Sequence, residues 1–140
     1  MFDGKNVWVT DTSAGLLKLD ASGAILQAVD VASPVGVVFD GANLWVPNNF
    51  SELTVVRAST GAILATLSGN GLDGVRAAAF DGERVLATNS AGSSVSLWKA
   101  ADLTPLGSFS TGSGSAPSGA CSDGVSFWIA LSATGQLARF

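Results

Sequence analysis

The stretch "VFDGANLWV" at residues 38–46 returns elsewhere in the chain. It appears as "MFDGKNVWV" at residues 1–9 and, more loosely, as "AFDGERVLA" at residues 79–87. The Asp-Gly pairs of the repeat begin at Asp3, Asp40, Asp81 and Asp123, which are separated by 37, 41 and 42 residues. A period near 40 residues is typical of repeat architectures, in which each repeat is one supersecondary unit. We therefore predict four repeats, approximately 1–33, 34–74, 75–116 and 117–140.

Each repeat contains signals for four short strands. In the second repeat, "VGVVFD" at 35–40 is rich in β-branched and aromatic residues and ends in Asp-Gly, a strong hairpin signal. The runs "NLWVPN" at 43–48, "LTVVRA" at 53–58 and "AILATLS" at 62–68 follow it. Nowhere does an apolar period of 3.6 residues persist over the ten or so residues that a helix needs. The sequence therefore predicts an all-β fold.

Strands that are apolar on both faces must be covered on both sides. Sheets arranged radially around an axis cover one another, and four strands in a period near 40 match one blade of a β-propeller. The run at 33–67 resembles the bacterial propeller repeats of the YVTN and NHL-like families, whose units resemble "PxGVAFDGxNIWVAN". The third repeat departs most from that pattern, with Leu86 in the tryptophan column and Val75-Arg76-Ala77 in place of the Pro-x-Gly lead-in. The resemblance implies four-stranded antiparallel blades.

The chain contains about 3.5 predicted blades. The first repeat has only the tail of its innermost strand, and the last stops with its third strand at Phe140. Because closed rings remove exposed lateral faces, we expect a second copy to complete the ring as a head-to-tail homodimer. A compact monomeric ring and a fragment of a longer propeller are the alternatives.

Composition limits the possible partners. The 140 residues are 47% apolar and 13% charged, with a net charge of −4, so the chain is long and apolar enough to fold around a core. The basic residues are scattered singly, which predicts no nucleic-acid partner. No apolar run is long enough for a membrane span and no signal peptide precedes the repeats. We expect a soluble protein with no membrane partner, whose localisation the sequence does not indicate.

Little in the sequence favours catalysis. Histidine is absent, and Cys121 is the only cysteine, so the commonest proton-transfer group and a cysteine metal cluster are both missing. The resemblance extends to streptogramin lyases and lactonase-type propellers, but a lyase histidine has no counterpart here. We predict no cofactor, no metal and no catalytic residue, with a metal-dependent hydrolase or lyase-like enzyme as the alternative. Cys121 is expected to be buried as a small apolar residue.

The resemblance places ligands of such propellers near the pore, where the loops between second and third strands emerge. Carried onto this chain, that column gives Asp11, Asn48 and Asn89, with Asn49 following and Arg76 in a neighbouring loop. One interpretation is a polar ring that binds a small polar or anionic ligand through charge-assisted hydrogen bonds. The other is that these Asn and Asp side chains hold turns through bonds to the backbone.

Two further repeated features have structural interpretations. The aspartates of the Asp-Gly turns are expected to form turns, because a calcium site needs several carboxylates in one place. Trp8, Trp45 and Trp128 are expected to pack between blades rather than to stack on sugars. "STGSGSAPSG" at 110–119 is expected to form a mobile loop on one face. The predicted function is a non-catalytic binding or protein-interaction platform.

Overall fold

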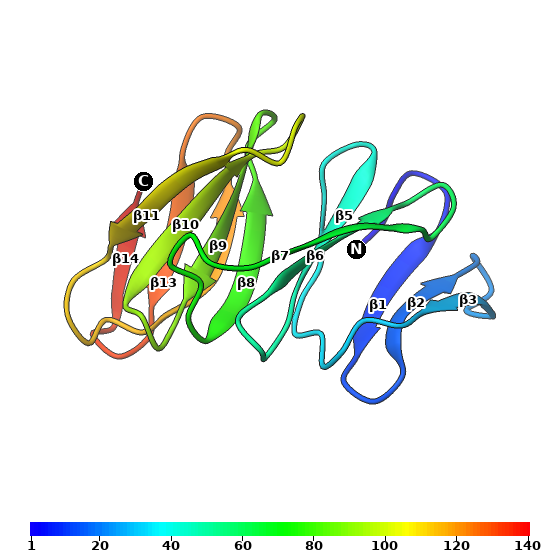
Figure 1. The fold of residues 1–140 in the computed structure, drawn as a ribbon, viewed down its shortest axis with the longest axis horizontal. Coiled ribbons are helices and arrows are strands. Elements are labelled where there is room, and N and C mark those ends of the chain that lie inside the picture. The colour runs from blue at the N-terminus through cyan, green and yellow to red at the C-terminus, as the bar shows by residue number, and fades with distance from the viewer.

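The computed structural model describes all 140 residues and contains fourteen strands in four antiparallel sheets, with no helix (Figure 1). The all-β prediction is therefore confirmed. We call the sheets blades 1 to 4 in chain order. Blade 1 comprises β1 (Val7–Asp11), β2 (Gly15–Leu19) and β3 (Ile25–Val29). Blade 2 comprises β4 (Val38–Phe39), β5 (Asn43–Pro47), β6 (Leu53–Arg57) and β7 (Ile63–Leu67).

The other half of the chain repeats this order. Blade 3 comprises β8 (Val75–Phe80), β9 (Arg84–Asn89), β10 (Ser94–Lys99) and β11 (Pro105–Ser110). Blade 4 comprises β12 (Pro117–Ser122), β13 (Phe127–Leu131) and β14 (Gln136–Arg139). Each strand pairs with its sequence neighbour within the blade. Within every blade the connections are therefore hairpins.

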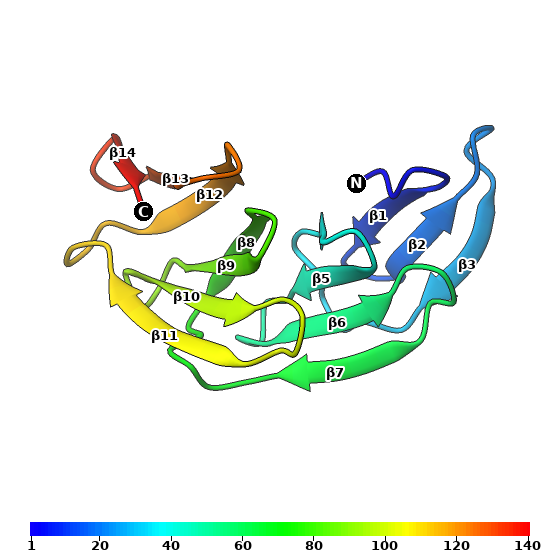
Figure 2. The same cartoon turned by 90° about the horizontal axis from the view of Figure 1, so that it is seen from above.

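The four blades stand side by side along an arc rather than a closed ring. Seen from above, β7 and β11 follow the convex side, while both termini lie on the open, concave side (Figure 2). Blades 1 and 4 form the two ends of the arc. Each end blade therefore has one sheet face that no other blade of this chain covers.

The core lies between the blades and follows one rule. The tryptophan side of each blade packs against the following blade: Trp8 and Leu16 of blade 1 meet Leu44 and Val46 of blade 2 in one buried cluster. Trp45 of blade 2 packs in the same way against blade 3. Leu86 takes the place of the tryptophan between blades 3 and 4. Each blade thus presents a projecting face to its successor and a receiving face to its predecessor.

The Asp-Gly turns have a second role that the sequence did not indicate. In blade 2, Asp40 Oδ1 accepts hydrogen bonds from the backbone N–H groups of Ala42 and Asn43, at 2.9 and 2.6 Å. Its Oδ2 accepts a hydrogen bond from the indole Nε1 of Trp45 at 2.7 Å. Asp3 with Trp8 and Asp123 with Trp128 repeat the arrangement. The aspartate therefore holds the turn and satisfies the polar group of the core tryptophan.

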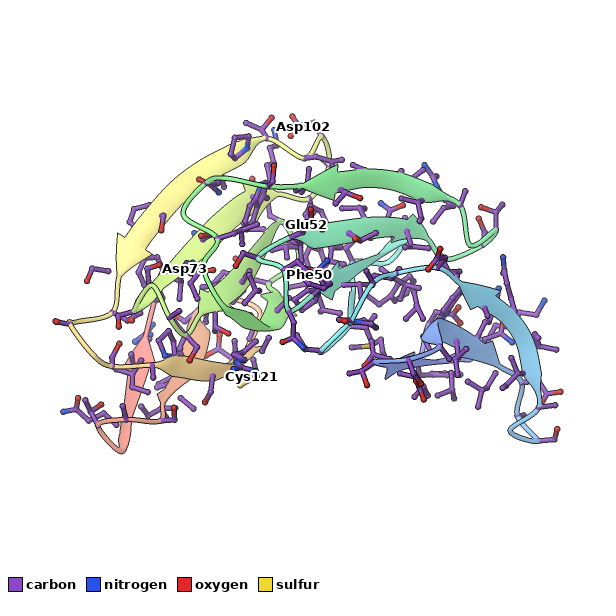
Figure 3. All side chains as sticks on the ribbon, turned by 60° about the horizontal axis from the view of Figure 1, so that its bottom comes forward. Phe50, Glu52, Asp73, Asp102 and Cys121 are labelled. Carbon is purple, nitrogen blue, oxygen red and sulfur yellow. The ribbon has the colours of Figure 1, made fainter.

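Three expectations need correction. Cys121 is exposed, because it lies on the uncovered face of blade 4 (Figure 3). Trp128 is only half-buried for the same reason, whereas Trp8 and Trp45 are fully buried. The segment 110–119 is not wholly a loop, since β11 ends at Ser110 and β12 begins at Pro117.

The structure contains no helix that is long and apolar enough to cross a membrane.

Candidate functional site

The loops between second and third strands and the loops between blades meet along one rim, which we call the loop rim. The Gly74 N–H donates to Ser51 Oγ at 2.9 Å, which joins the loop between blades 2 and 3 to the β5–β6 loop. The Ser90 N–H donates to the Gly74 carbonyl at 3.0 Å, which joins it to the β9–β10 loop. Figure 3 shows Phe50, Glu52 and Asp73 in this row of loops. The structure therefore brings these loop types together.

Two of the five predicted site residues hold their own turns. Asp11 Oδ1 accepts hydrogen bonds from Ser13 Oγ and from the Ser13 and Ala14 N–H groups, at 2.6 to 2.8 Å. These hydrogen bonds, led by the Ser13 hydroxyl, lower the pKa of Asp11. Asn48 is buried, and its Oδ1 accepts from the Phe50 and Glu52 N–H groups at 3.0 Å. Both geometries match turn-holding side chains.

The other three residues differ in exposure. Asn89 is fully buried, and its amide nitrogen donates to Ser94 and Ser96 hydroxyls, while its Oδ1 has no hydrogen-bond partner. Asn49 and Arg76 are exposed. No hydrogen bond or ion pair joins any two of the five predicted side chains. In addition, no group of three or more Asp, Glu or Cys side chains could hold a metal ion.

The two clefts of the molecule lie on the opposite rim, where the Asp-Gly turns are, which we call the turn rim. The first lies between blades 1 and 2 and has a volume of about 400 Å³. The second lies between blades 2 and 3 and has a volume of about 350 Å³. The first cleft is lined by Asp3, Lys5, Asn6, Lys18, Phe39, Gly41, Ala42, Arg57, Ala58 and Ser59. The second is lined by Asp40, Ala42, Asn43, Phe80, Gly82, Glu83, Ala100 and Ala101.

The clefts occupy equivalent positions in successive repeats. The second begins at Asp40 and Ala42 where the first begins at Asp3 and Lys5. Equivalent hydrogen bonds lie in the two linings. In the first cleft the Ala58 N–H donates to the Ala42 carbonyl, and in the second the Ala100 N–H donates to the Glu83 carbonyl. Sequence reasoning missed both clefts because it placed ligands on the loop rim. A signal was available in the residue that follows each Asp-Gly pair, because its charge changes from Lys5 through Ala42 to Glu83.

The outer faces of the end blades are apolar and exposed. On blade 1, Phe2 is 60% exposed and Val9 is 42% exposed, although their blade 2 counterparts Phe39 and Val46 pack against blade 1. On blade 4, Leu137 is 66% exposed, although its counterpart Leu16 is fully buried. The end faces are therefore one receiving face and one projecting face without their partners.

Solved structures similar to this chain identify the architecture. The chain matches the structure of U3-55K over 99% of its length at 16% identity, with a TM-score of 0.77. It matches a catalytically inactive variant of virginiamycin B lyase from Staphylococcus aureus, solved with quinupristin, over 96% of its length at 17% identity and a TM-score of 0.77. The chain forms an incomplete β-propeller. It spans about half of each of those chains, 49% and 47%.

A third match is closer in size. The computationally designed Ika4 protein matches over 99% of this chain and 86% of its own, at 15% identity and a TM-score of 0.83. No model of a known protein family matches the chain, and no curated protein matches it in sequence. The likeness therefore concerns the arrangement of blades.

Proposed function

We propose that this chain is a non-catalytic β-propeller module of the YVTN and NHL-like bacterial type, which serves as a binding and protein-interaction platform. Its first partner is a second copy of itself, which completes the ring. The observation that carries the proposal is the pair of uncovered end faces. One is the projecting kind and the other is the receiving kind, and these two kinds pack together at every blade boundary inside the chain.

The residue types at the two ends support this pairing. The projecting pair of blade 1, Trp8 and Leu16, is fully buried by blade 2, and blade 4 carries Trp128 and Leu137 at the same positions. The receiving face of blade 1 presents Val7 and Val9 to solvent. Burial of such side chains stabilises an interface by about 25 cal/mol for each Å² of apolar surface removed from water. The uncovered faces thus provide a driving force for association.

Charge at the turn rim also favours this pairing. Arg139 of blade 4 occupies the register position of Lys18, since Trp128 pairs with Arg139 as Trp8 pairs with Lys18. Lys18 reaches blade 2 and donates to the Ala58 carbonyl at 3.1 Å. In blade 1 the residue that corresponds to Ala58 is Ala21, and Asp20 directly precedes it. In a ring of two copies, Arg139 of each would therefore approach Asp20 of the other.

The state of the loop rim favours a platform over an enzyme. The hydrogen bonds that the Asp11, Asn48 and Asn89 side chains form lie within their own loops and hairpins. Catalysis by general acid–base transfer needs a positioned titratable group near the reacting atoms. The exposed side chains Asn49 and Arg76 remain available for contact with a ligand or a protein on this rim.

Sedimentation velocity tests the proposal on the 140-residue chain. We expect a species of twice the 14.0 kDa chain mass at micromolar concentration. Val9→Lys places a charge in the receiving face at the position where its counterpart Val46 packs with Trp8 and Leu16. We expect this variant to give the 14.0 kDa monomer. Because a two-fold ring repeats the same interface twice, one substitution weakens both interfaces.

Leu64→Lys is the matched control. Leu64 is 44% exposed on β7, close to the 42% of Val9, but it lies on the convex side rather than on an end face. We expect this variant to keep the mass of the dimer. A monomer that also fails to bind an apolar dye would contradict the proposal. A monomer that binds the dye strongly would instead favour a fragment whose remaining blades lie on the same polypeptide.

A further inference from the structure

The first cleft of the turn rim concentrates positive charge. The chain has seven basic residues, and three of them, Lys5, Lys18 and Arg57, line this one cleft. Asp3 is the only acidic residue in its lining. In a protein with a net charge of −4, this excess of cations at one concave place is not a property of the surface as a whole.

The acidic residue in the lining is already engaged by neutral donors. Asp3 Oδ1 accepts from the N–H groups of Lys5 and Asn6, at 2.9 and 2.7 Å, and Oδ2 accepts from the Trp8 indole at 2.7 Å. None of the three cations forms an ion pair, since the two ion pairs of the molecule are Arg84 with Asp81 and Lys99 with Asp102. Three cations therefore face one carboxylate in the lining, and none of them lies within ion-pair distance of it.

The cations are held in different ways. Lys18 is half-buried, and its ammonium lies 5.1 Å from the centre of the Trp8 ring while it donates one hydrogen bond to the Ala58 carbonyl. An ammonium has three donors, so two remain for a ligand. Lys5 and Arg57 are exposed and come from opposite walls, one on blade 1 and one on blade 2. The cleft thus has one cation held in place by contacts within the chain, Lys18, and two exposed cations whose side chains are free to adjust.

The second cleft provides an internal comparison. It has the same place in the repeat, yet Ala42 stands in the column of Lys5, and Glu83 stands in the column of Ala42. Lys99 has the strand position of Arg57, but its ammonium lies 3.8 Å from Asp102. Both clefts therefore arise from the repeated geometry of the blades, whereas the excess of positive charge is found only in the first cleft.

We propose that the first cleft is a binding site for a small oxyanion, with Lys18 as the fixed contact and Lys5 and Arg57 closing on the ligand from both sides. Phosphates and dicarboxylates share the required chemistry, because both present charged oxygens that ammonium and guanidinium groups bind through charge-assisted hydrogen bonds. A volume of about 400 Å³ accommodates a small ligand of this kind. The site lies within one chain and does not depend on ring closure.

Isothermal titration with pyrophosphate and with succinate tests this site and separates the two ligand types. We expect saturable binding of at least one of them at low ionic strength, and weaker binding at high salt because the contacts are partly exposed. Lys5→Gln and Arg57→Gln should each weaken binding about fivefold or more, since each removes a charged hydrogen bond. Both side chains are exposed, so both variants are expected to fold.

The controls are charge-matched. Lys99→Gln changes the equivalent strand position of the second cleft, and Arg76→Gln removes the cation of the loop rim, so both should leave binding unchanged. Val9→Lys should also bind normally, which separates this site from the proposal on ring closure. If neither pyrophosphate nor succinate binds at low salt, the inference is overturned. Equal weakening by Lys99→Gln and Arg57→Gln would overturn it too, since binding would then follow overall charge.

Discussion

The aspartate of each Asp-Gly pair is the residue on which the blade depends. Its one oxygen holds the hairpin turn, and in three blades its other oxygen accepts the indole N–H of the tryptophan five residues later. In blade 3, where Leu86 replaces the tryptophan, Asp81 Oδ2 instead accepts from Arg84 Nε at 2.8 Å and lies 2.7 Å from Arg84 Nη2. The second oxygen of the aspartate thus accepts a hydrogen bond in every blade, from a tryptophan in three of them and from Arg84 in blade 3.

Asp40→Asn tests this link between turn and core. The amide keeps an oxygen for the turn but places an NH₂ group opposite the indole N–H of Trp45, which is fully buried. We expect a loss of about 1–3 kcal/mol in the free energy of unfolding, because a buried donor loses its acceptor. Urea denaturation measures it. In a double-mutant cycle the loss should shrink when Trp45→Phe removes the donor first, and an unchanged loss would show that only the turn matters.

Acidification should destabilise the protein through two of these aspartates, Asp123 and Asp81. Hydrogen bonds from the Trp128 indole and from the Ser126 and Val125 N–H groups lower the pKa of Asp123 from 3.8 to about 2. For Asp81, burial raises the pKa, but hydrogen bonds from Arg84 and Glu83 N–H groups and the Arg84 side chain lower it more. A carboxylate whose pKa is lower in the folded state stabilises the fold above the unfolded pKa, and this stability is lost as the pH falls.

The melting temperature should therefore change little between neutral pH and pH 5 and should fall as the pH drops from about 4 towards 2. Thermal unfolding followed by circular dichroism over this series measures the effect. Asp123→Asn should show a shallower fall than the unmodified chain, because one of the carboxylates that takes up a proton is missing. A melting temperature that stays constant down to pH 2 would contradict the assignment.

At the scale of elements, the hairpins rely on glycine where strands crowd each other. Gly15 opens β2 with a φ of +87°, and a Cβ there would collide with the Val29 carbonyl oxygen of β3. Gly4 has a similar φ of +94°, but a Cβ there would meet no atom within 4 Å. The two positions therefore separate backbone strain from steric collision.

Gly4→Ala should cost about 1–2 kcal/mol in the free energy of unfolding, because an L-residue is strained in the left-handed region. Gly15→Ala should cost a further 1–3 kcal/mol or so, because the added methyl group must displace the backbone of β3. Urea denaturation of the two variants side by side measures the difference. Equal losses would mean that β3 moves away without cost.

At the scale of the whole molecule, the arc leaves one projecting and one receiving face open. If a second copy covers them, folding and association are linked, and stability depends on the concentration of the chain. We expect the melting temperature to rise by about 3 °C for each tenfold increase in protein concentration. Differential scanning calorimetry over a hundredfold range measures this. Val9→Lys should remove the dependence, and a dependence that survives this substitution would place the interface elsewhere.

Much of the blade was predictable from sequence, and the site was not. The turn signals and the β-branched runs are local, so they located the strands of blade 2, where β4 to β7 fall within the predicted ranges. The column of Asp11, Asn48 and Asn89 was also visible. That Asn48 and Asn89 are buried, and hydrogen-bonded near their own turns, depends on how their loops close, which a column of letters does not show.

The repeating unit of this protein, a blade built of hairpins about every 40 residues, can be predicted from the residues alone, because turn chemistry and strand periodicity act between near neighbours. Which apolar column of each blade projects and which receives depends on contacts between residues a whole repeat apart, so it is visible only once the chain is folded. Folding also brings Lys5 and Lys18 of one blade to the same cleft as Arg57 of the next. Exposure of Cys121 and Trp128 followed in the same way, because burial depends on whether another blade stands beside the sheet.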